Sequence, residues 1–407
     1  MSREQWRLDP LQLEEVKGLI AIPMSTEEAS NQPSESKADV TRSMLLIGVG
    51  YFTFLMCDNR DGIGKIALKL ILKDHYHLHG DQIASFLAIV FMAWYFKPLA
   101  GLLTDSIPLF GTRRRHYLLL STASAVFCWF AIGRVHSVVT LMWAFIGLNI
   151  AYVLGQTTLG GLLVERGKAT QSVGRLTSLR NAVENIAVLI AGPIAGWFGS
   201  KVLGYTVGAN IAILLLSTLF FFIVAKEAPE MKLKSEVWRN AFSQVKLLLR
   251  TKYMWIAAGL WFMVRFSPGF QTALFFYQTD TLKFSAGFIG LLSSMNGGGC
   301  ILASIFYVAV CRTIPLRRLL TLGIVLNAIG FACYLKYNSH PSALVLEMVN
   351  GIVTSLAFIP LMDLMARATP KGCEALGYAL LFSFGNISVS LSDIIGAKIY
   401  NLVASKN

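Results

Sequence analysis

The chain has few charged residues for its length, and this shortage is its first informative feature. Only 14% of its 407 residues are Asp, Glu, Lys or Arg, whereas 55% are hydrophobic and 12% are aromatic. Such a composition excludes intrinsic disorder, which requires low hydrophobicity and high net charge. It also lies outside the range of ordinary soluble domains. The composition therefore predicts an integral membrane protein.

Cysteine is also scarce, and none of the spacings typical of zinc sites occurs. The six cysteines are scattered along the chain, which excludes a disulfide scaffold, and we expect neither a metal nor a cofactor. Enzymatic signatures are lacking too. The triplet Gly297–Gly299 lacks the Lys-Ser or Lys-Thr that follows a phosphate-binding loop. We therefore expect a protein that is not an enzyme.

Long hydrophobic runs recur from Met44 onward. Each has roughly 18–28 residues, enough to cross about 30 Å of hydrocarbon as a helix. Only helices or closed barrels satisfy backbone polar groups in lipid, and these runs are too continuous for barrel strands. No twelfth run is found, so a last helix is predicted to be missing or truncated. We predict about eleven spans, at residues 44–72, 82–103, 116–133, 138–163, 176–198, 202–225, 253–279, 286–310, 318–335, 342–367 and 374–400.

Basic residues are divided unevenly between the two sets of loops. In a soluble protein the net charge of +13 would suggest a nucleic-acid partner, but here the bases lie between hydrophobic runs, so we expect none. One set of loops holds Arg113–Arg115 and seven bases between Lys226 and Lys252, whereas the other set holds isolated bases. By the positive-inside rule, the amino terminus then lies on the cytoplasmic side.

The longest internal loop separates six predicted spans from five. Residues 226–252 are basic and contain Pro229, as expected of a cytoplasmic linker between two helical bundles. The predicted parts are a polar, disordered cytoplasmic tail (1–40), an N-terminal six-helix bundle (41–225), the linker (226–252) and a C-terminal bundle with five clear spans (253–407).

The segment between the second and third predicted spans carries a specific motif. It reads KPLAGLLTDSIPLFGTRRR from Lys97 to Arg115 and resembles the signature KPxxGxxxDSxPxxGxRRR of the folate-biopterin transporter family, a branch of the major facilitator superfamily. Two further stretches, Ser267–Gly290 and Ile359–Leu381, are similar to the family's seventh helix and to its junction between helices ten and eleven. The resemblance implies an all-α membrane protein with a two-bundle, major facilitator-type fold.

The resemblance also implies a function. A protein of this family is expected to be a secondary active transporter that moves folates or pterins such as biopterin by alternating access, with protons as the expected coupling ion. Another small anionic or zwitterionic cargo, or a non-transporting relative that has lost its last helix, is the alternative. We expect a monomer in the lipid bilayer whose partner is its small-molecule substrate. The plasma membrane and a plastid envelope are both open as locations.

The same motif implies a gating loop formed by Asp105, Gly111, Arg113, Arg114 and Arg115. Asp105 is placed where it could pair with the arginines or cap a neighbouring helix, and Gly111 allows the chain to turn. In transporters of this superfamily the loop is associated with the exchange between inward-open and outward-open forms. The plainer alternative is a cytoplasmic turn that only holds positive-inside arginines.

Ionisable residues inside the predicted spans are candidates for a binding site, because a charge at a helix centre costs about 2.5–3.5 kcal/mol on insertion scales. In the first span Asp58, Asp61 and Lys65 follow at i, i+3 and i+7, which predicts one helical stripe, with Arg60 pointing elsewhere. The stripe is either a self-neutralised ion-pair cluster or a cavity wall that offers a proton acceptor and a cation.

Charges in later spans extend the set of candidates. Arg180 and Glu184 can pair at i, i+4, and Arg265 has no acidic neighbour at helical spacing, so another helix, water or an anionic solute must meet its charge. Uncharged polar residues in spans four and ten could bind a heterocycle or join helices. The predicted substrate contacts are Asp58, Arg60, Asp61, Tyr152, Gln156, Arg265, Gln271 and Asn350, and the predicted proton-coupling or ion-pair residues are Asp58, Asp61, Arg180, Glu184 and Glu347.

Overall fold

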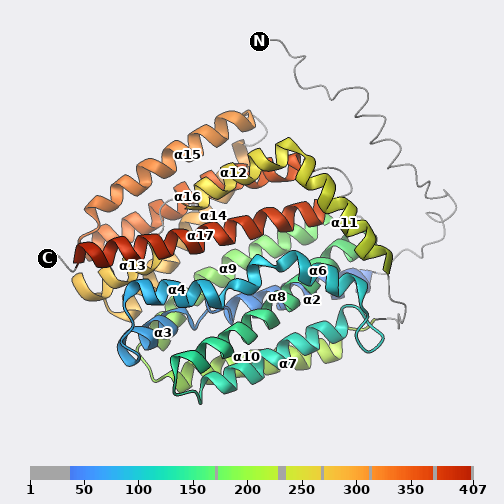
Figure 1. Cartoon of the computed structure of the whole chain (residues 1–407), viewed down its shortest axis with the longest axis horizontal. Coiled ribbons are helices and arrows are strands. Elements are labelled where there is room, and N and C mark those ends of the chain that lie inside the picture. The colour runs from blue at the N-terminus through green and yellow to red at the C-terminus, as the bar shows by residue number, and fades with distance from the viewer. Residues whose placement is uncertain are drawn as a thin grey trace, which may run out of the picture.

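The computed structural model describes residues 37–169, 173–227, 235–266, 270–310, 314–369 and 374–404. Most of the predicted tail and residues 228–234 of the predicted linker lie outside this set. The described chain is almost entirely helical, and most helices lie side by side along the long axis of the molecule (Figure 1). This agrees with the predicted all-α membrane fold.

The helices of the N-terminal half fall in the first six predicted ranges. Helix α2 packs against α8, α9 and α10, and α7 lies against both α8 and α10. Trp129 and Phe145 are among the large side chains buried between these helices. The elements are α2 (Lys37–Met56), α3 (Lys65–Leu70), the π-helix η1 (Ile71–His75), α4 (Gly80–Val90), α5 (Met92–Tyr95), α6 (Lys97–Ser106), α7 (Arg115–Ile132), α8 (Val138–Ala169), α9 (Val173–Gly199) and α10 (Leu203–Val224).

The helices of the C-terminal half pack around α16, which contacts α12, α14 and α15, while α17 lies against α12. The predicted linker contains a helix, α11, that buries Ala241 and Leu248 one heptad apart and exposes Phe242. The elements are α11 (Ser235–Arg250), α12 (Lys252–Phe266), α13 (Gln271–Phe276), the π-helix η2 (Tyr277–Thr281), α14 (Ala286–Val310), α15 (Leu316–Cys333), the short η3 (Tyr334–Lys336), α16 (His340–Ala368) and α17 (Glu374–Ala404).

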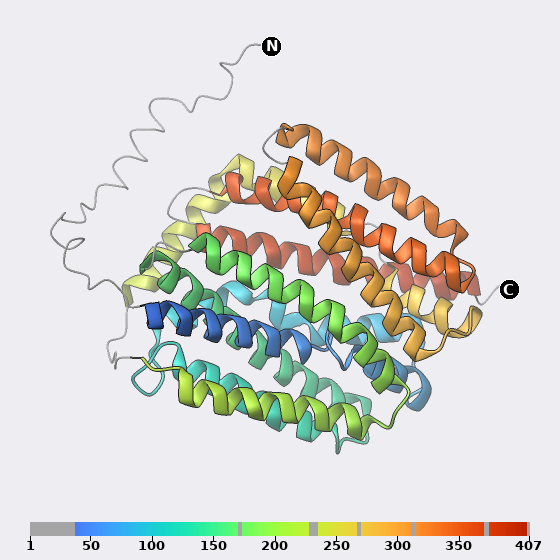
Figure 2. The same ribbon diagram turned by 180° about the vertical axis from the view of Figure 1, so that it is seen from behind.

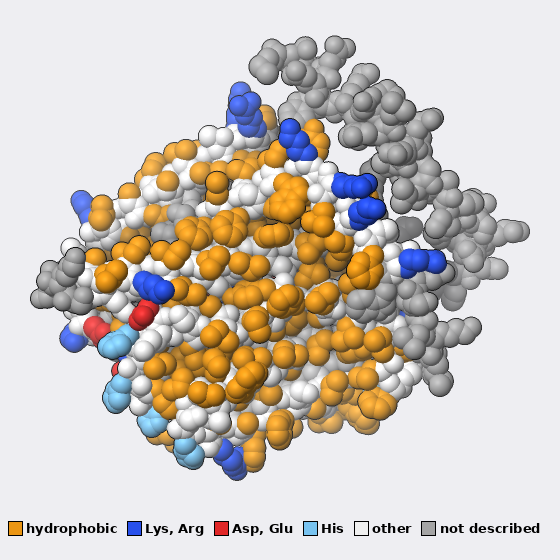
Figure 3. Space-filling view, viewed as in Figure 1, with side chains coloured by type: hydrophobic (Ala, Val, Ile, Leu, Met, Phe, Trp, Pro, Cys, Tyr) orange, Lys and Arg blue, Asp and Glu red, His pale blue; other side chains and the backbone are white. Residues whose placement is uncertain are grey.

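Seven of the described helices are long and apolar enough to cross a membrane: α8, α9, α10, α14, α15, α16 and α17. Of the other predicted ranges, 116–133 holds the continuous helix α7, and the rest hold interrupted helices, so the number of crossings stays a prediction. Figure 3 shows a broad apolar surface with histidines gathered at one end and most visible Lys and Arg side chains along the other rim. We call the end where α3 and η1 lie the histidine end, because η1 ends at His75, and the opposite end, where α6 is joined to α7, the arginine end, because α7 begins at Arg115 (Figure 1).

The first predicted span of each half is interrupted at the same relative position. Helix α2 ends at Met56 before α3, and α12 ends at Phe266 before α13. The half-helices α3 and α13 each have six residues, and each continues as a π-helix of five residues. Equivalent residues lie 206 positions apart, as Lys73 and Thr279 do. The two halves are therefore an internal repeat.

The interruption corrects the predicted helical stripe of Asp58, Asp61 and Lys65, because residues 57–64 do not form a helix. Backbone bonds from Gly62 N to Asp58 O (2.9 Å) and from Ile63 N to Met56 O (2.8 Å) close a compact loop instead. A Cβ at Gly62 would lie 2.4 Å from the carbonyl oxygens of both Asp58 and Met56. Only glycine fits this loop, so helical spacing does not apply across it.

Two helix pairs join the halves, and the repeat relates them to each other. Helix α9 packs against α14, and α4 packs against α17. The two pairs are equivalent, because α4 and α14 each follow the interrupted span of their half. Their partners α9 and α17 are each the fifth predicted span of theirs. Figure 2 shows α14 crossing α9 on the back of the molecule. The crossing is close, since a Cβ at Gly290 would lie 2.4 Å from Gly192 O.

Candidate functional site

A pocket lies between the two halves beside the interrupted spans, and we call it the interbundle pocket. The apolar part of its lining comes mainly from α4 and the adjoining Phe91. The rest comes from the loop 57–64, α3, α13 and α17, so both halves contribute. A site at the junction of two repeats, next to broken helices, is the usual place for substrate in membrane carriers. Its polar lining consists of Asn59, Arg60, Lys65, Lys69, Gln271, Ser390 and Asp393.

Arg60 reaches from the loop 57–64 to both walls of this pocket. Its guanidinium carbon lies 4.1 Å from the centre of the Phe91 ring, and Nη1 donates to Asn386 Oδ1 of α17 at 3.3 Å. The cation is thus held against an aromatic face. Buried Asp58 accepts a bond from the Arg60 backbone N at 3.2 Å, whereas Asp61 is exposed. Of the predicted residues Asp58, Arg60 and Asp61, only Arg60 is in the described lining of the pocket, and all three lie on a loop rather than on a helix.

Asn59 is the side chain of the pocket whose polar atoms are most available to a ligand. Its side chain is only 3% exposed, and neither Oδ1 nor Nδ2 has a hydrogen-bond partner among the described residues. A buried polar group without a partner costs about 1–3 kcal/mol. Because Asn59 lines the pocket, a polar ligand placed there would supply the missing donor and acceptor.

Asp393 and Lys69 are not among the residues predicted above, yet both line the pocket. Asp393, 8% exposed, accepts bonds from Thr272 N at 2.8 Å and from Thr272 Oγ1 at 2.6 Å. It therefore ties the start of α13 to α17. Both residues are charges inside predicted spans, so the criterion that selected Asp58 also points to them. Gln271, which was predicted, lines the pocket at the first position of α13.

Arg265 lies outside the interbundle pocket. Its guanidinium carbon is 4.9 Å from the centre of the Phe358 ring and 5.6 Å from that of Trp261. Its buried Nε has no hydrogen-bond partner in the described part of the chain. Of the three partners expected for this charge, another helix supplies one here, since Phe358 belongs to α16.

The remaining predicted residues are not in the described lining of the pocket. Tyr152 OH donates to Cys57 O and accepts from Trp129 Nε1, both at 2.8 Å, so it supports the loop 57–64 from behind. Gln156 is buried in α8. The other predicted residues form polar contacts with protein side chains. Two contacts lie within one helix, Asn350 Oδ1 with Thr354 Oγ1 at 3.1 Å and Arg180 Nε with Glu184 Oε1 at 2.8 Å. The third joins α16 to α14, from Glu347 Oε2 to Asn296 Nδ2 at 3.4 Å.

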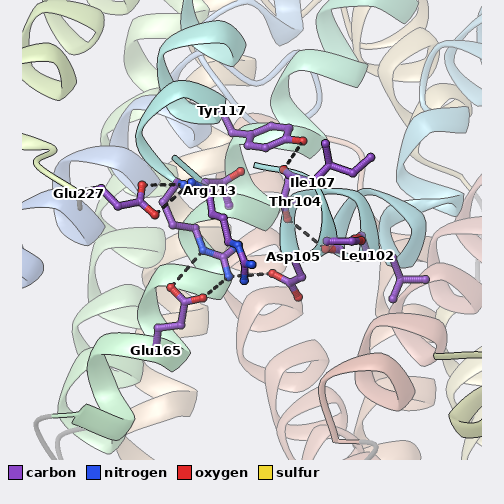
Figure 4. A network of polar contacts seen from close by, with 12 residues as sticks. Leu102, Thr104, Asp105, Ile107, Arg113, Tyr117, Glu165 and Glu227 are labelled. Carbon is purple, nitrogen blue, oxygen red and sulfur yellow. Dashed lines mark hydrogen bonds and ion pairs between the residues drawn. The ribbon is translucent and has the colours of Figure 1, made fainter. Parts of the chain in front are cut away.

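The predicted gating loop forms a charged network at the arginine end (Figure 4). Arg114 Nη2 donates to Asp105 at 2.7 Å and to Glu165 of α8 at 2.5 Å, and Arg114 Nε donates to Glu165 at 3.2 Å. Burial opposes the charge of Arg114, but the bonds and charges of Glu165 and Asp105 outweigh it and raise its pKa. Gly111 has φ +82° in the turn before the arginines, a value that favours glycine.

Glu227, just after α10, completes this network and was not predicted. Its carboxylate accepts bonds from the backbone N of Arg113 at 3.1 Å, of Arg114 at 2.9 Å and of Arg115 at 3.0 Å. It thus caps the free N–H groups at the start of α7, where a negative charge is also favoured. Of the two roles expected for Asp105, the structure shows pairing with an arginine, while Glu227 provides the helix cap.

Comparison with known proteins agrees with this architecture. The sequence model of the BT1 family matches residues 60–407. A folate-biopterin transporter of Synechocystis sp. is 26% identical in a match that covers 83% of this chain and 71% of that protein. Folate transporter 1 of Plasmodium falciparum is 22% identical in a match that covers 82% of this chain and 68% of that protein. The crystal structure of the nucleoside transporter NupG superposes with a TM-score of 0.67 at 15% identity, covering 88% of this chain and 90% of NupG. The fold is that of a major facilitator-type transporter.

Proposed function

Because this chain belongs to the BT1 family, and is a transporter rather than an enzyme, we propose that it moves folates or pterins across a membrane as a secondary active transporter. The observation that carries the proposal is the interbundle pocket, which both halves line beside the interruption that they share. The relatives named as folate transporters support the choice of cargo.

The position of the pocket between the halves supports a proposal of alternating access. Residues 41–225 and 253–407 are taken as the two bundles that rock about it. At the histidine end Lys73 pairs with Asp280 across the two halves. At the arginine end Asp105, Arg114 and Glu165 form their network within the N-terminal half. By the positive-inside rule the arginine end faces the cytosol, and opening of one end at a time exposes the pocket to each side in turn.

The pocket offers the groups that a pterin ring needs. The ring is flat and carries donors and acceptors along its edge, so it stacks on an aromatic face such as Phe91 and bonds to amides. Asn59 and Gln271 are the amide side chains of the lining. Asn59 in particular has both polar atoms free for such bonds within the described structure.

Proton coupling is the second part of the proposal. Asp58 and Glu347 are buried carboxylates, and Asp61 is an exposed one beside the pocket. A carboxylate that faces first one side and then the other can bind a proton outside and release it inside, which drives cargo in the same direction. Arg265, whose Nε is unpaired in the described part of the chain, is proposed as an additional cation for an anionic cargo.

Uptake of labelled folate, methylfolate and biopterin into cells that lack their own uptake tests the function. We expect saturable uptake of at least one of them, faster at an acidic than at a neutral external pH, and reduced in Arg60→Gln. The matched control is Lys201→Gln, at an exposed lysine outside the pocket. Uptake of all three equal to that of cells without the protein contradicts the function. Uptake that ignores pH contradicts proton coupling alone, and competition by other small anions tests the alternative cargo.

A further inference from the structure

The interbundle pocket has a charge pattern that distinguishes between the cargoes considered above. We propose that it selects carboxylate-bearing cargo, so that this chain transports folates in preference to biopterin; this rests on the proposed function. A folate is a pterin joined through aminobenzoate to glutamate, which carries two carboxylates. Biopterin has the same ring with an uncharged side chain. Only the glutamate part separates the two cargoes by charge.

The lining of the pocket carries more positive than negative charge. Arg60, Lys65 and Lys69 face it, whereas Asp393 is its one lining carboxylate in the described residues. Both oxygens of Asp393 are already used by Thr272, through its backbone N and its hydroxyl. Cations at membrane depth are costly unless an anion accompanies them. An anionic cargo therefore gains free energy there that a neutral one cannot.

The two lysines are the cations best placed for a dicarboxylate. They are four residues apart on α3 and so lie on one face, about 5–6 Å apart at Cβ. Among the residues that the structure describes, neither forms an ion pair. Lys69 Nζ lies 5.3 Å from the centre of the Phe275 ring, so it is held in place by an aromatic face. Two cations one helical turn apart match two carboxylates separated by a few bonds.

The carboxylates near the lysines leave this site available. The charges of Asp393 and Asp61 act on Lys69, and those of Asp61, Glu347 and Asp58 act on Lys65. None of these carboxylates forms an ion pair with either lysine in the described part of the chain. Asp61 is exposed, and Asp393 is directed to α13. The amide of Asn59 adds a buried donor without a partner in the described chain, which can bond a carboxylate oxygen or the ring edge.

Competition for labelled folate uptake by the purified full-length protein in liposomes tests the selectivity. Unlabelled folate should compete best, pteroate, which keeps one carboxylate, should be weaker, and biopterin should be weaker than folate by about tenfold or more, as expected for the loss of charge-assisted hydrogen bonds. Biopterin competing as well as folate would overturn the inference and leave the transport function standing. Absence of saturable uptake of any pterin compound contradicts the proposed function, and the inference with it.

Variants assign the selectivity to the two lysines. Lys65→Gln and Lys69→Gln should each raise the KM for folate by about tenfold while the KM for biopterin and the thermal unfolding temperature change little. Lys69→Arg keeps the charge and should keep folate affinity. Lys201→Gln, at an exposed lysine whose Nζ lies 5.6 Å from the Trp197 ring centre, should leave both cargoes unaffected. Equal weakening of folate and biopterin in the glutamine variants would overturn the assignment.

Discussion

Lys73 donates a hydrogen bond from Nζ to Thr279 Oγ1 at 2.6 Å, and these residues hold the same position in the two halves, 206 residues apart. The axis that relates the halves therefore passes between them. Lys73 also pairs with the adjacent Asp280, and nearby Asn401 Nδ2 of α17 donates to Asp81 Oδ1 of α4 at 2.6 Å. The halves are thus joined at the histidine end, where their symmetry axis leaves the protein.

Removal of this connection should favour opening at the histidine end. Lys73→Met deletes the ion pair and the bond to Thr279, interactions that together are worth about 1–2 kcal/mol, which changes the ratio of open to closed molecules by about 5–30-fold. Spin labels at His75 and Thr281, both exposed, would report a longer distance population. Lys201→Met is the matched control, and an unchanged distance distribution in Lys73→Met would show that the pair does not hold this end closed.

Gly62 should tolerate no side chain. Gly62→Ala places a Cβ 2.4 Å from the carbonyl oxygens of Asp58 and Met56, so the loop must shift, and we expect a loss of about 1–3 kcal/mol in the free energy of unfolding. Thermal unfolding of the purified protein measures it. Gly208→Ala in α10 serves as control, since nothing lies within 4 Å of that position and alanine is the better helix former by about 1 kcal/mol. Equal unfolding temperatures for the two variants would contradict the loop geometry.

The positions of the helices could be predicted from the sequence, but the loop at residues 57–64 could not. Apolar runs long enough to cross lipid leave few alternatives to a helix, and helices occupy each predicted range in the described chain. Spacing arguments assume that a helix continues, and they failed for Asp58, Asp61 and Lys65. The sequence did carry one sign of the interruption, the glycines Gly62 and Gly64, because glycine is a poor helix former.

The pairing partners of the site could not be read from spacing either. Asp393 binds Thr272, which lies 121 residues away. Glu227 binds the backbone of Arg113–Arg115, more than a hundred residues before it in the chain. Only the fold brings such groups together. By contrast, Arg180 and Glu184 are four residues apart on one helix, and their contact follows from helical geometry.

Asp393 should stabilise the fold through the hydrogen bonds that its oxygens accept from Thr272, rather than through its charge. Asp393→Ala leaves Thr272, whose side chain is 0% exposed, with an unpaired N–H and hydroxyl, so we expect a loss of about 1–3 kcal/mol in unfolding free energy. Asp393→Asn keeps an acceptor for Thr272 N and a donor toward its hydroxyl, so most stability should remain. Thermal unfolding distinguishes the two, and equal losses in both variants would mean that the charge itself matters.

The network at the arginine end should affect the transport rate more than cargo binding. Asp105→Asn removes the negative charge that Asp105 presents to Arg114. The Asp105 side chain is 48% exposed, so the lost interaction is worth only about 0.2–1 kcal/mol. We expect up to about fivefold slower folate transport with unchanged binding affinity. Asp74→Asn, at an exposed position of η1, makes the same chemical change outside the network. Loss of binding with an unchanged rate would contradict a gating role.

Counterflow of folate tests the central claim most directly, because it requires a site that faces both sides in turn and needs no knowledge of the coupling ion. Liposomes holding the purified protein are filled with unlabelled folate and diluted into a trace of labelled folate. If the pocket between the halves carries folate by alternating access, the label rises inside above its external concentration and then falls. A label that never exceeds its equilibrium level, as in protein-free liposomes, would contradict the account.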